Sequence, residues 1–201
     1  MPDTSLTAKD YVRHVEEIVA GGAPKDETVK AIQALLTHAL EVPGWLPERC
    51  CMPARDCYAR HLLYRDPMER FTIVAMVWEK GQMTPIHDHG GCWCVEGVYE
   101  GRIRVNRYDL DAPMTGGVAR FHSFDLIEAG IGQCGALIPP VDYHVIENPF
   151  DRKAITIHTY GGDMKTCHVY LPREDGSFEA RTKELSYTTR PDLPVADAVR
   201  H

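Results

Sequence analysis

The chain has 201 residues, of which 44% are apolar and 25% are charged. This composition is typical of one globular domain and excludes a fibrous, coiled-coil or disordered chain. No run of about 18 apolar residues occurs, so no transmembrane helix is predicted. The first residues lack the apolar stretch of a secretory signal, which predicts a cytoplasmic location. The formal charge of −7, from 22 Lys and Arg against 29 Asp and Glu, argues against nucleic acid as a partner.

Sulfur and imidazole groups are the unusual part of the composition, with seven cysteines and ten histidines. An odd number of cysteines in a chain without a secretory signal argues against a disulfide framework. Thiol, metal or redox chemistry is therefore expected, with buried inert thiols as the alternative.

The N-terminal residues 1–44 predict two helices. Thr7 and Asp10 have the spacing of a capping box, and valines follow at helical intervals. Asp26 is the predicted cap of the second helix, which carries a stripe of Ile and Leu and ends before Pro43-Gly44. A loop rich in Cys, Pro and Arg follows.

Short runs of β-branched and aromatic residues begin near Tyr58 and are separated by turn residues, which predicts a β-sandwich or barrel over residues 58–172. No helical pattern lies between them, so a parallel α/β sheet is not expected. The polar residues 173–201 are predicted to be less regular and to wrap the surface. The expected strands are Phe71–Trp78, Trp93–Tyr99, Arg102–Tyr108, Ser123–Ile127, Gly135–Ile138, His144–Glu147, Ile155–Tyr160 and His168–Leu171. We expect a single domain over residues 1–201.

The segment around His87-Asp88-His89 carries the clearest chemical signal. Residues i and i+2 of a strand project to the same face, so the two imidazoles can reach one metal ion, whereas Asp88 should face away. Two unrelated surface histidines are the alternative for an isolated pair. The wider spacing favours a metal site: Gly81 precedes His87 by six positions, and Cys94 and Gly101 follow His89 by five and twelve.

This spacing resembles the first cupin motif, with Cys94 in the place of its metal-binding Glu. Pro139, His144 and Asn148 resemble the second motif, although Val141 replaces its glycine. The resemblance implies a mainly β cupin jelly roll, here with two N-terminal helices. It also implies three metal ligands, His87, His89 and His144.

A closer resemblance is to the cysteine dioxygenase family of thiol dioxygenases, and to its bacterial members in particular. Three histidines with Cys in place of Glu are shared with that family, and so is Tyr58-Ala-Arg60, whose Arg binds the substrate carboxylate there. Thr156-Ile-His158-Thr-Tyr160 resembles the Ser-x-His-x-Tyr element whose Tyr reaches the active site.

The resemblance implies one Fe(II) per chain, O₂ as co-substrate and oxidation of L-cysteine to cysteine sulfinate. Arg60 and Tyr58 would bind the substrate, while Tyr160 and His158 would position the reacting groups. A surface ion pair for Arg60 and an ordinary hydrogen bond for the Tyr160 hydroxyl are the bland alternatives.

Cys94 lies five residues after His89, an odd offset that strict alternation would place on the opposite face. Gly90-Gly91 could supply a bulge that restores the face. In animal members of the family this Cys forms a thioether with the active-site Tyr, so the resemblance implies a Cys94–Tyr160 crosslink. A small buried thiol is the alternative.

Substrate choice stays open between two thiols. Relatives that prefer 3-mercaptopropionate tend to carry Gln and Gly in place of Arg60 and Cys94, so both residues favour cysteine. The run Gly161-Gly162-Asp163, in contrast, differs from the Ser-Pro-Pro of the animal enzymes and resembles the bacterial group. A metal-binding cupin without turnover is a third hypothesis. The sequence predicts neither the oligomeric state nor the resting metal.

The other cysteines give weaker signals. No CxxC pair predicts a zinc knuckle, Cys134 is expected in the core, and Cys167 is expected to line the substrate pocket by resemblance. No role is assigned to Cys50, Cys51, Cys57 or Cys92.

Overall fold

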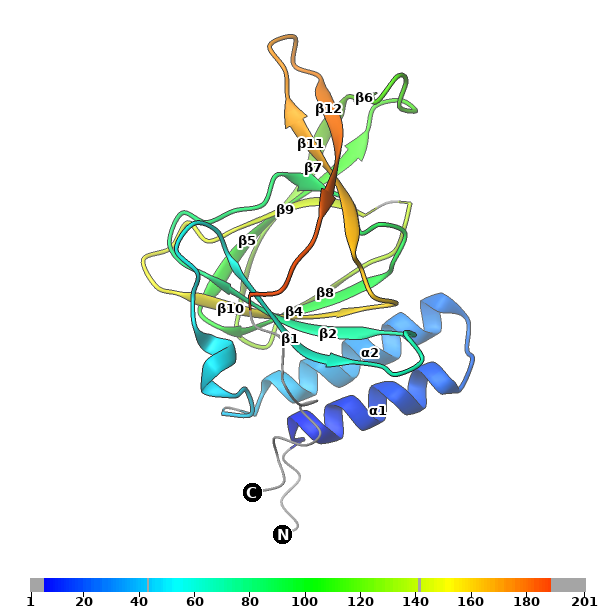
Figure 1. Cartoon of the computed structure of the whole chain (residues 1–201), viewed down its shortest axis with the longest axis vertical. Helices are drawn as coiled ribbons and strands as arrows, with labels where there is room; N and C mark the ends of the chain where they lie inside the picture. The colour runs from blue at the N-terminus through cyan, green and yellow to red at the C-terminus, as the bar shows by residue number, and fades with distance from the viewer. Residues whose placement is uncertain (1–5, 43, 141, 189–201) are drawn as a thin grey trace.

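The computed structural model describes residues 6–42, 44–140 and 142–188. Two helices lie side by side against one face of a curved β structure, and the remaining strands curl above them (Figure 1). No helix in these ranges is long and apolar enough to cross a membrane. The expected mainly β cupin architecture with two N-terminal helices is confirmed.

The helices are α1 (Ala8–Ala20) and α2 (Lys25–Leu40), and a short 3₁₀ helix covers Glu48–Cys51. The predicted capping box is present, because the Thr7 hydroxyl accepts from the Asp10 amide and the Asp10 carboxylate accepts from the Thr7 amide. The prediction for Asp26 is wrong. The N-cap is Pro24, two residues before Asp26, so helix α2 begins at Lys25, and no side chain caps it. Proline has a fixed φ and so preorganises that first turn.

A five-stranded sheet and a seven-stranded sheet face each other. The five-stranded sheet has, in spatial order, β1 (Ala59–Arg65), β2 (Thr72–Trp78), β10 (Ala154–Tyr160), β4 (Cys94–Glu100) and β8 (Cys134–Leu137). The seven-stranded sheet has β6 (Val118–Ala119), β12 (Phe178–Glu184), β11 (Thr166–Pro172), β3 (Ile86–His87), β9 (Tyr143–Glu147), β5 (Arg102–Leu110) and β7 (Phe121–Gly130).

Strand β12 corrects one prediction, since residues 178–184 form a regular strand and not an irregular wrap. Its side chains are mostly polar because the strand is largely exposed, and it is held by backbone pairing to β11. A polar strand of this kind gives no apolar alternation for sequence analysis to detect. The part of the expected wrap beyond residue 188 lies outside the described residues.

The five-stranded sheet is buried on both faces, and its strands alternate between them. In β2, Ile73, Ala75 and Val77 pack against the helices, whereas Val74, Met76 and Trp78 face the barrel interior. In β10 the same alternation sends Ile155 and Ile157 to the helices. The helices therefore complete the outer core, and the inner face of the sheet lines the barrel interior with a second set of side chains.

Candidate functional site

Three histidines converge in the barrel, two of them from the seven-stranded sheet. His87 is the last residue of β3, His89 follows in the next turn, and His144 in β9 is the direct cross-strand partner of His87. The nitrogen atoms that they offer all lie within 4.8 Å of one another, and the Nε2 atoms of His87 and His144 are 3.2 Å apart. Cross-strand pairing and i, i+2 spacing together produce this cluster.

The second ring nitrogens of two histidines are engaged outside the cluster. Nδ1 of His87 donates to the Pro85 carbonyl at 3.1 Å, and Nδ1 of His89 donates to the Asp142 carboxylate at 3.1 Å. Asp142 also accepts from the His89 amide at 3.0 Å. These bonds leave the Nε2 lone pairs directed into the cluster, which is the arrangement that metal-binding histidines require.

The cluster fits a divalent transition-metal ion. Burial lowers the pKa of His87 to about 3 and holds the pKa of His144 well below its usual range, so both imidazoles are neutral. Two nitrogens bound at about 2.1 Å to one ion, at roughly a right angle, lie about 3 Å apart, which agrees with the spacing of the two Nε2 atoms. Three imidazoles and no carboxylate suit iron, copper, nickel or zinc.

The facing sheet brings Cys94 and Tyr160 together. They are direct partners in the pairing of β4 with β10, and both are buried. The odd offset between His89 and Cys94 is absorbed in the turn, where Gly90 and Gly91 both have positive φ. The strand therefore restarts with Cys94 pointing into the barrel, as the sequence analysis expected of the two glycines. Burial raises the pKa values of the Cys94 thiol and the Tyr160 hydroxyl well above their usual ranges.

Asp88 supports this turn from outside. Its carboxylate accepts from the Gly90 and His168 amides at 3.1 and 2.9 Å and lies 2.9 Å from His168 Nδ1. It points away from the three histidines, as its position between two ligands predicted.

A line of hydrogen bonds runs along the inner face beside Tyr160. The Trp78 indole donates to the Thr156 hydroxyl at 2.9 Å, and that hydroxyl lies 2.7 Å from Nε2 of His158. The rings of His158 and Tyr160 are nearly parallel, with centroids 5.9 Å apart. Since the indole N–H can only donate, the hydroxyl proton of Thr156 is available for Nε2 of His158.

Arg60 brings a positive charge into the same cavity. Only 5% of its surface is exposed, and its Nε and Nη1 atoms have no hydrogen-bond partner among the described residues. Its guanidinium lies 5.3 Å from the Tyr187 ring centroid, and nearby Tyr58 stacks on Trp78 at 4.5 Å. A buried guanidinium with free donors is suited to bind an anion.

The cavity lined by these groups unites most of the residues expected from the sequence. Cys167 lies on its wall, whereas Cys134 is half-buried and lines a second cavity instead. The lining residues predicted from sequence are Tyr58, Arg60, His87, His89, His144, His158, Tyr160 and Cys167.

Two acidic residues of the site were missed by the sequence analysis. Asp142 holds His89, and Glu96 lies 3.6 Å from His144 and 3.3 Å from His158. Burial raises the pKa of Glu96 to about 7. One signal was available: Glu96 is at i+2 from Cys94 and therefore shares its face.

The two-sheet barrel and its buried histidine cluster define a metal-binding cupin. The cysteine dioxygenase type I family model matches residues 4–173, and the chain belongs to that family of thiol dioxygenases. Cysteine dioxygenase type 1 of Rattus norvegicus is 23% identical over 171 residues, covering 83% of this chain and 80% of the relative. The Homo sapiens enzyme is similar to the same extent. A Klebsiella pneumoniae protein with a double-stranded β-helix domain aligns with a TM-score of 0.45 and 13% identity, over 70% of this chain and 98% of its own.

Proposed function

We propose that the protein oxidises L-cysteine to cysteine sulfinate with O₂, at an Fe(II) ion held by His87, His89 and His144. The observation that carries the proposal is the presence, in one buried cavity, of the histidine cluster and of the Arg60 guanidinium, whose Nε and Nη1 have no partner within the described residues. Both oxygen atoms of O₂ join the substrate sulfur, so the reaction balances without a further reductant. The ferrous ion would supply thiolate binding and activation of O₂.

The residues of the five-stranded sheet have separate roles in this proposal. Arg60 binds the substrate carboxylate through two N–H groups, and Tyr58 shapes the cavity beside it. Tyr160, stacked beside His158, directs its hydroxyl toward the reacting groups. Cys94 lies opposite Tyr160 in the strand pairing, the position from which a thioether can form.

Oxidation of 3-mercaptopropionate at the same three-histidine site is the second candidate. It is favoured by Gly161-Gly162-Asp163, which follows Tyr160 where the animal enzymes have Ser-Pro-Pro. Gly161 packs tightly on the Trp93 indole, because a Cβ there would lie 2.1 Å from Nε1 of Trp93. Any residue with a Cβ at position 161 would therefore require the Trp93 ring to move.

The test is anaerobic loading with Fe(II), followed by O₂ uptake with L-cysteine and 3-mercaptopropionate in parallel assays. We expect faster uptake with cysteine and one sulfinate formed per O₂ consumed, measured by mass spectrometry. A His144→Ala variant serves as the control without a complete metal site. Faster uptake with 3-mercaptopropionate would establish the second candidate, and iron binding without thiol-dependent uptake would indicate a cupin without turnover.

A further inference from the structure

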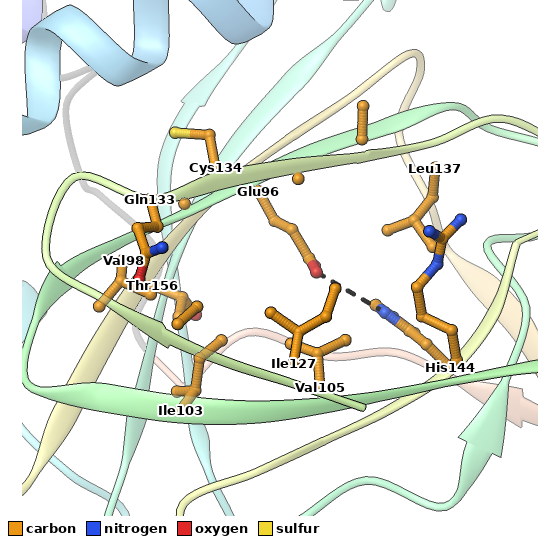
Figure 2. Close-up of a pocket in the computed structure, with 15 residues that line it drawn as sticks. Glu96, Val98, Ile103, Val105, Ile127, Gln133, Cys134, Leu137, His144 and Thr156 are labelled. Atoms are coloured by element: carbon orange, nitrogen blue, oxygen red, sulfur yellow. Dashed lines mark ion pairs between the residues drawn. The ribbon is translucent and has the colours of Figure 1, made fainter. Parts of the chain in front are cut away.

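Glu96 is a buried carboxylate that has no role in the proposed reaction as described so far. It follows Cys94 by two positions in β4 and projects into the barrel, with 6% of its surface exposed. It does not join the cluster of three histidines but lies behind His144. Figure 2 shows the carboxylate and the His144 ring pointing toward each other across the cavity wall.

The two ring nitrogens of His144 have different surroundings. Nε2 faces the cluster, 3.2 Å from Nε2 of His87, so a metal ion would use that lone pair. The proton of the neutral ring then resides on Nδ1, which is buried and has no hydrogen-bond partner in the part of the chain that the structure describes. The nearest acceptor in the recorded contacts is Oε1 of Glu96 at 3.6 Å.

In the contact with His158, too, the imidazole nitrogen would be the donor and Glu96 the acceptor. Nε2 of His158 is occupied by the Thr156 hydroxyl, which can donate to it because the Trp78 indole donates to that hydroxyl. With the proton of the neutral ring on Nδ1, that nitrogen lies 3.3 Å from Oε2 of Glu96 and 3.9 Å from Sγ of Cys94. The two oxygens of Glu96 thus lie 3.6 and 3.3 Å from the two Nδ1 atoms. Among the described residues, Oε2 of Glu96 and Nδ1 of His144 make no hydrogen bond, so a small movement of the carboxylate would be enough to join them.

We propose that Glu96 is a positioning residue that accepts the Nδ1–H groups of His144 and His158 and so orients a metal ligand and the neighbour of Tyr160 together. The inference rests on the proposed metal site. The Asp142 carboxylate accepts from Nδ1 of His89, and the Pro85 carbonyl accepts from Nδ1 of His87. With Glu96 in this role, each of the three proposed ligands would have an acceptor behind it.

The second cavity gives access to Glu96 from outside the thiol pocket. It has a volume of about 170 Å³ and lies between the inner faces of β5, β7 and β8, with Glu96 and His144 in its wall. The other lining side chains shown in Figure 2 are mostly apolar. Removing the Glu96 side chain would extend this cavity to Nδ1 of His144, leaving room for a small carboxylate such as formate.

The experiment measures the anaerobic Fe(II) dissociation constant by competition with a chromogenic chelator. Glu96→Gln and Glu96→Ala are expected to weaken binding about 10- to 100-fold, as loss of a carboxylate behind a ligating histidine does. Asp142→Asn is the positive comparator. Glu147→Gln is the matched control, because Glu147 is on β9 but pairs with Arg104 away from the cluster. Thermal unfolding confirms that each variant is folded.

Formate separates positioning from a packing role. We expect millimolar formate to restore most of the Fe(II) affinity of Glu96→Ala and to leave wild type, Asp142→Asn and Glu147→Gln unchanged. Unaltered affinity in both folded Glu96 variants, with weakened binding in Asp142→Asn, would overturn the role of Glu96 while the metal site stands. Absence of Fe(II) binding in the wild type would instead contradict the proposed function.

Discussion

Arg60 is the residue on which substrate binding depends most directly in the proposed reaction. Its side chain is buried with free donors, so an Arg60→Ala variant should lose a charge-assisted carboxylate contact. We expect the KM for cysteine to rise about 10- to 100-fold. Fe(II) binding should be unchanged, because Arg60 is on the opposite sheet from the proposed ligands His87 and His144.

Arg65→Ala is the control for this variant, since Arg65 is in the same strand but is half-exposed and pairs with Asp163. Steady-state kinetics and iron titration of both variants measure the effect. Loss of iron with an unchanged KM in Arg60→Ala would show that the assignment of Arg60 is wrong.

A crosslink between Cys94 and Tyr160 would change the intact mass of the protein. Formation of a thioether joins Sγ of Cys94 to a ring carbon of Tyr160 and removes one hydrogen from each, with O₂ as oxidant. After turnover with Fe(II), thiol and O₂, the intact mass should therefore fall by two hydrogens. A Cys94→Ala variant should show no such fall, and an unchanged mass in the wild type would exclude the crosslink.

The three histidines, Arg60 and Tyr160 could be predicted from the sequence as candidate site residues, because their motifs have fixed spacings along the chain. The hydrogen-bond and ion-pair partners of those residues could not. Asp142 meets His89 across 53 positions, and Glu96 meets His144 through the packing of two sheets. Such contacts depend on strand register and sheet stacking, which short-range spacing does not encode.

At the scale of the element, the turn between β3 and β4 decides where His89 lies. Gly90 and Gly91 both have positive φ, so alanine should strain the backbone by about 1 kcal/mol at either position. Only at Gly90 would the new Cβ also meet backbone, 2.5 Å from the Thr166 carbonyl oxygen, while nothing lies within 4 Å at Gly91.

We therefore expect Gly90→Ala to displace His89 and to weaken Fe(II) binding by at least about tenfold, whereas Gly91→Ala loses stability alone. Chelator competition and thermal unfolding of the two variants separate these effects. Equal iron affinities would contradict the role of the Gly90 contact in placing His89.

The β1–β2 hairpin contains an ion pair with a buried carboxylate, Asp66, which should make stability depend on pH. Arg70 donates to both Asp66 oxygens at 2.8 Å, and the hydrogen bonds from Arg70 hold the pKa of Asp66 below 3.8. A lowered folded pKa stabilises the protein above the unfolded pKa, and the contribution is lost as pH falls through the folded value.

Asp66→Asn should accordingly be less stable than the wild type at pH 7, and the difference should shrink below about pH 4. Denaturant unfolding at several pH values measures it. Asp151→Asn is the control, because its ion pair with Lys80 is exposed and contributes little. A difference that stays constant down to pH 2 would contradict the linkage.

The elements themselves were predicted where an apolar pattern marks them. Helix α1, with its capping box, and the buried strands β2 and β10 follow directly from such patterns. The two-residue strands β3 and β6 are too short to show alternation, and β12 is too polar. Their pairing partners define them as strands.

For the whole molecule, we propose that helices and barrel form one folding unit, as the single-domain prediction requires. Ile32 in α2 is fully buried in the core shared with the five-stranded sheet. Ile32→Ala should lower the free energy of unfolding by about 2–5 kcal/mol. The barrel and the helices should still unfold in one transition, followed by tryptophan fluorescence and by circular dichroism. Two separate transitions would contradict a single unit.

The division of the site between two sheets has a consequence for substrate selection. The proposed ligands His87 and His144 belong to one sheet and Arg60 to the other, and stacked sheets keep a nearly constant separation of about 10 Å. In the proposed reaction this separation limits the distance between the sulfur and the carboxylate of a bound substrate. L-cysteine and 3-mercaptopropionate have the same number of carbons between those groups. The fixed distance between the sheets is therefore compatible with both and disfavours shorter or longer thiol acids. Discrimination between the two must therefore come from the side chains that face the amine.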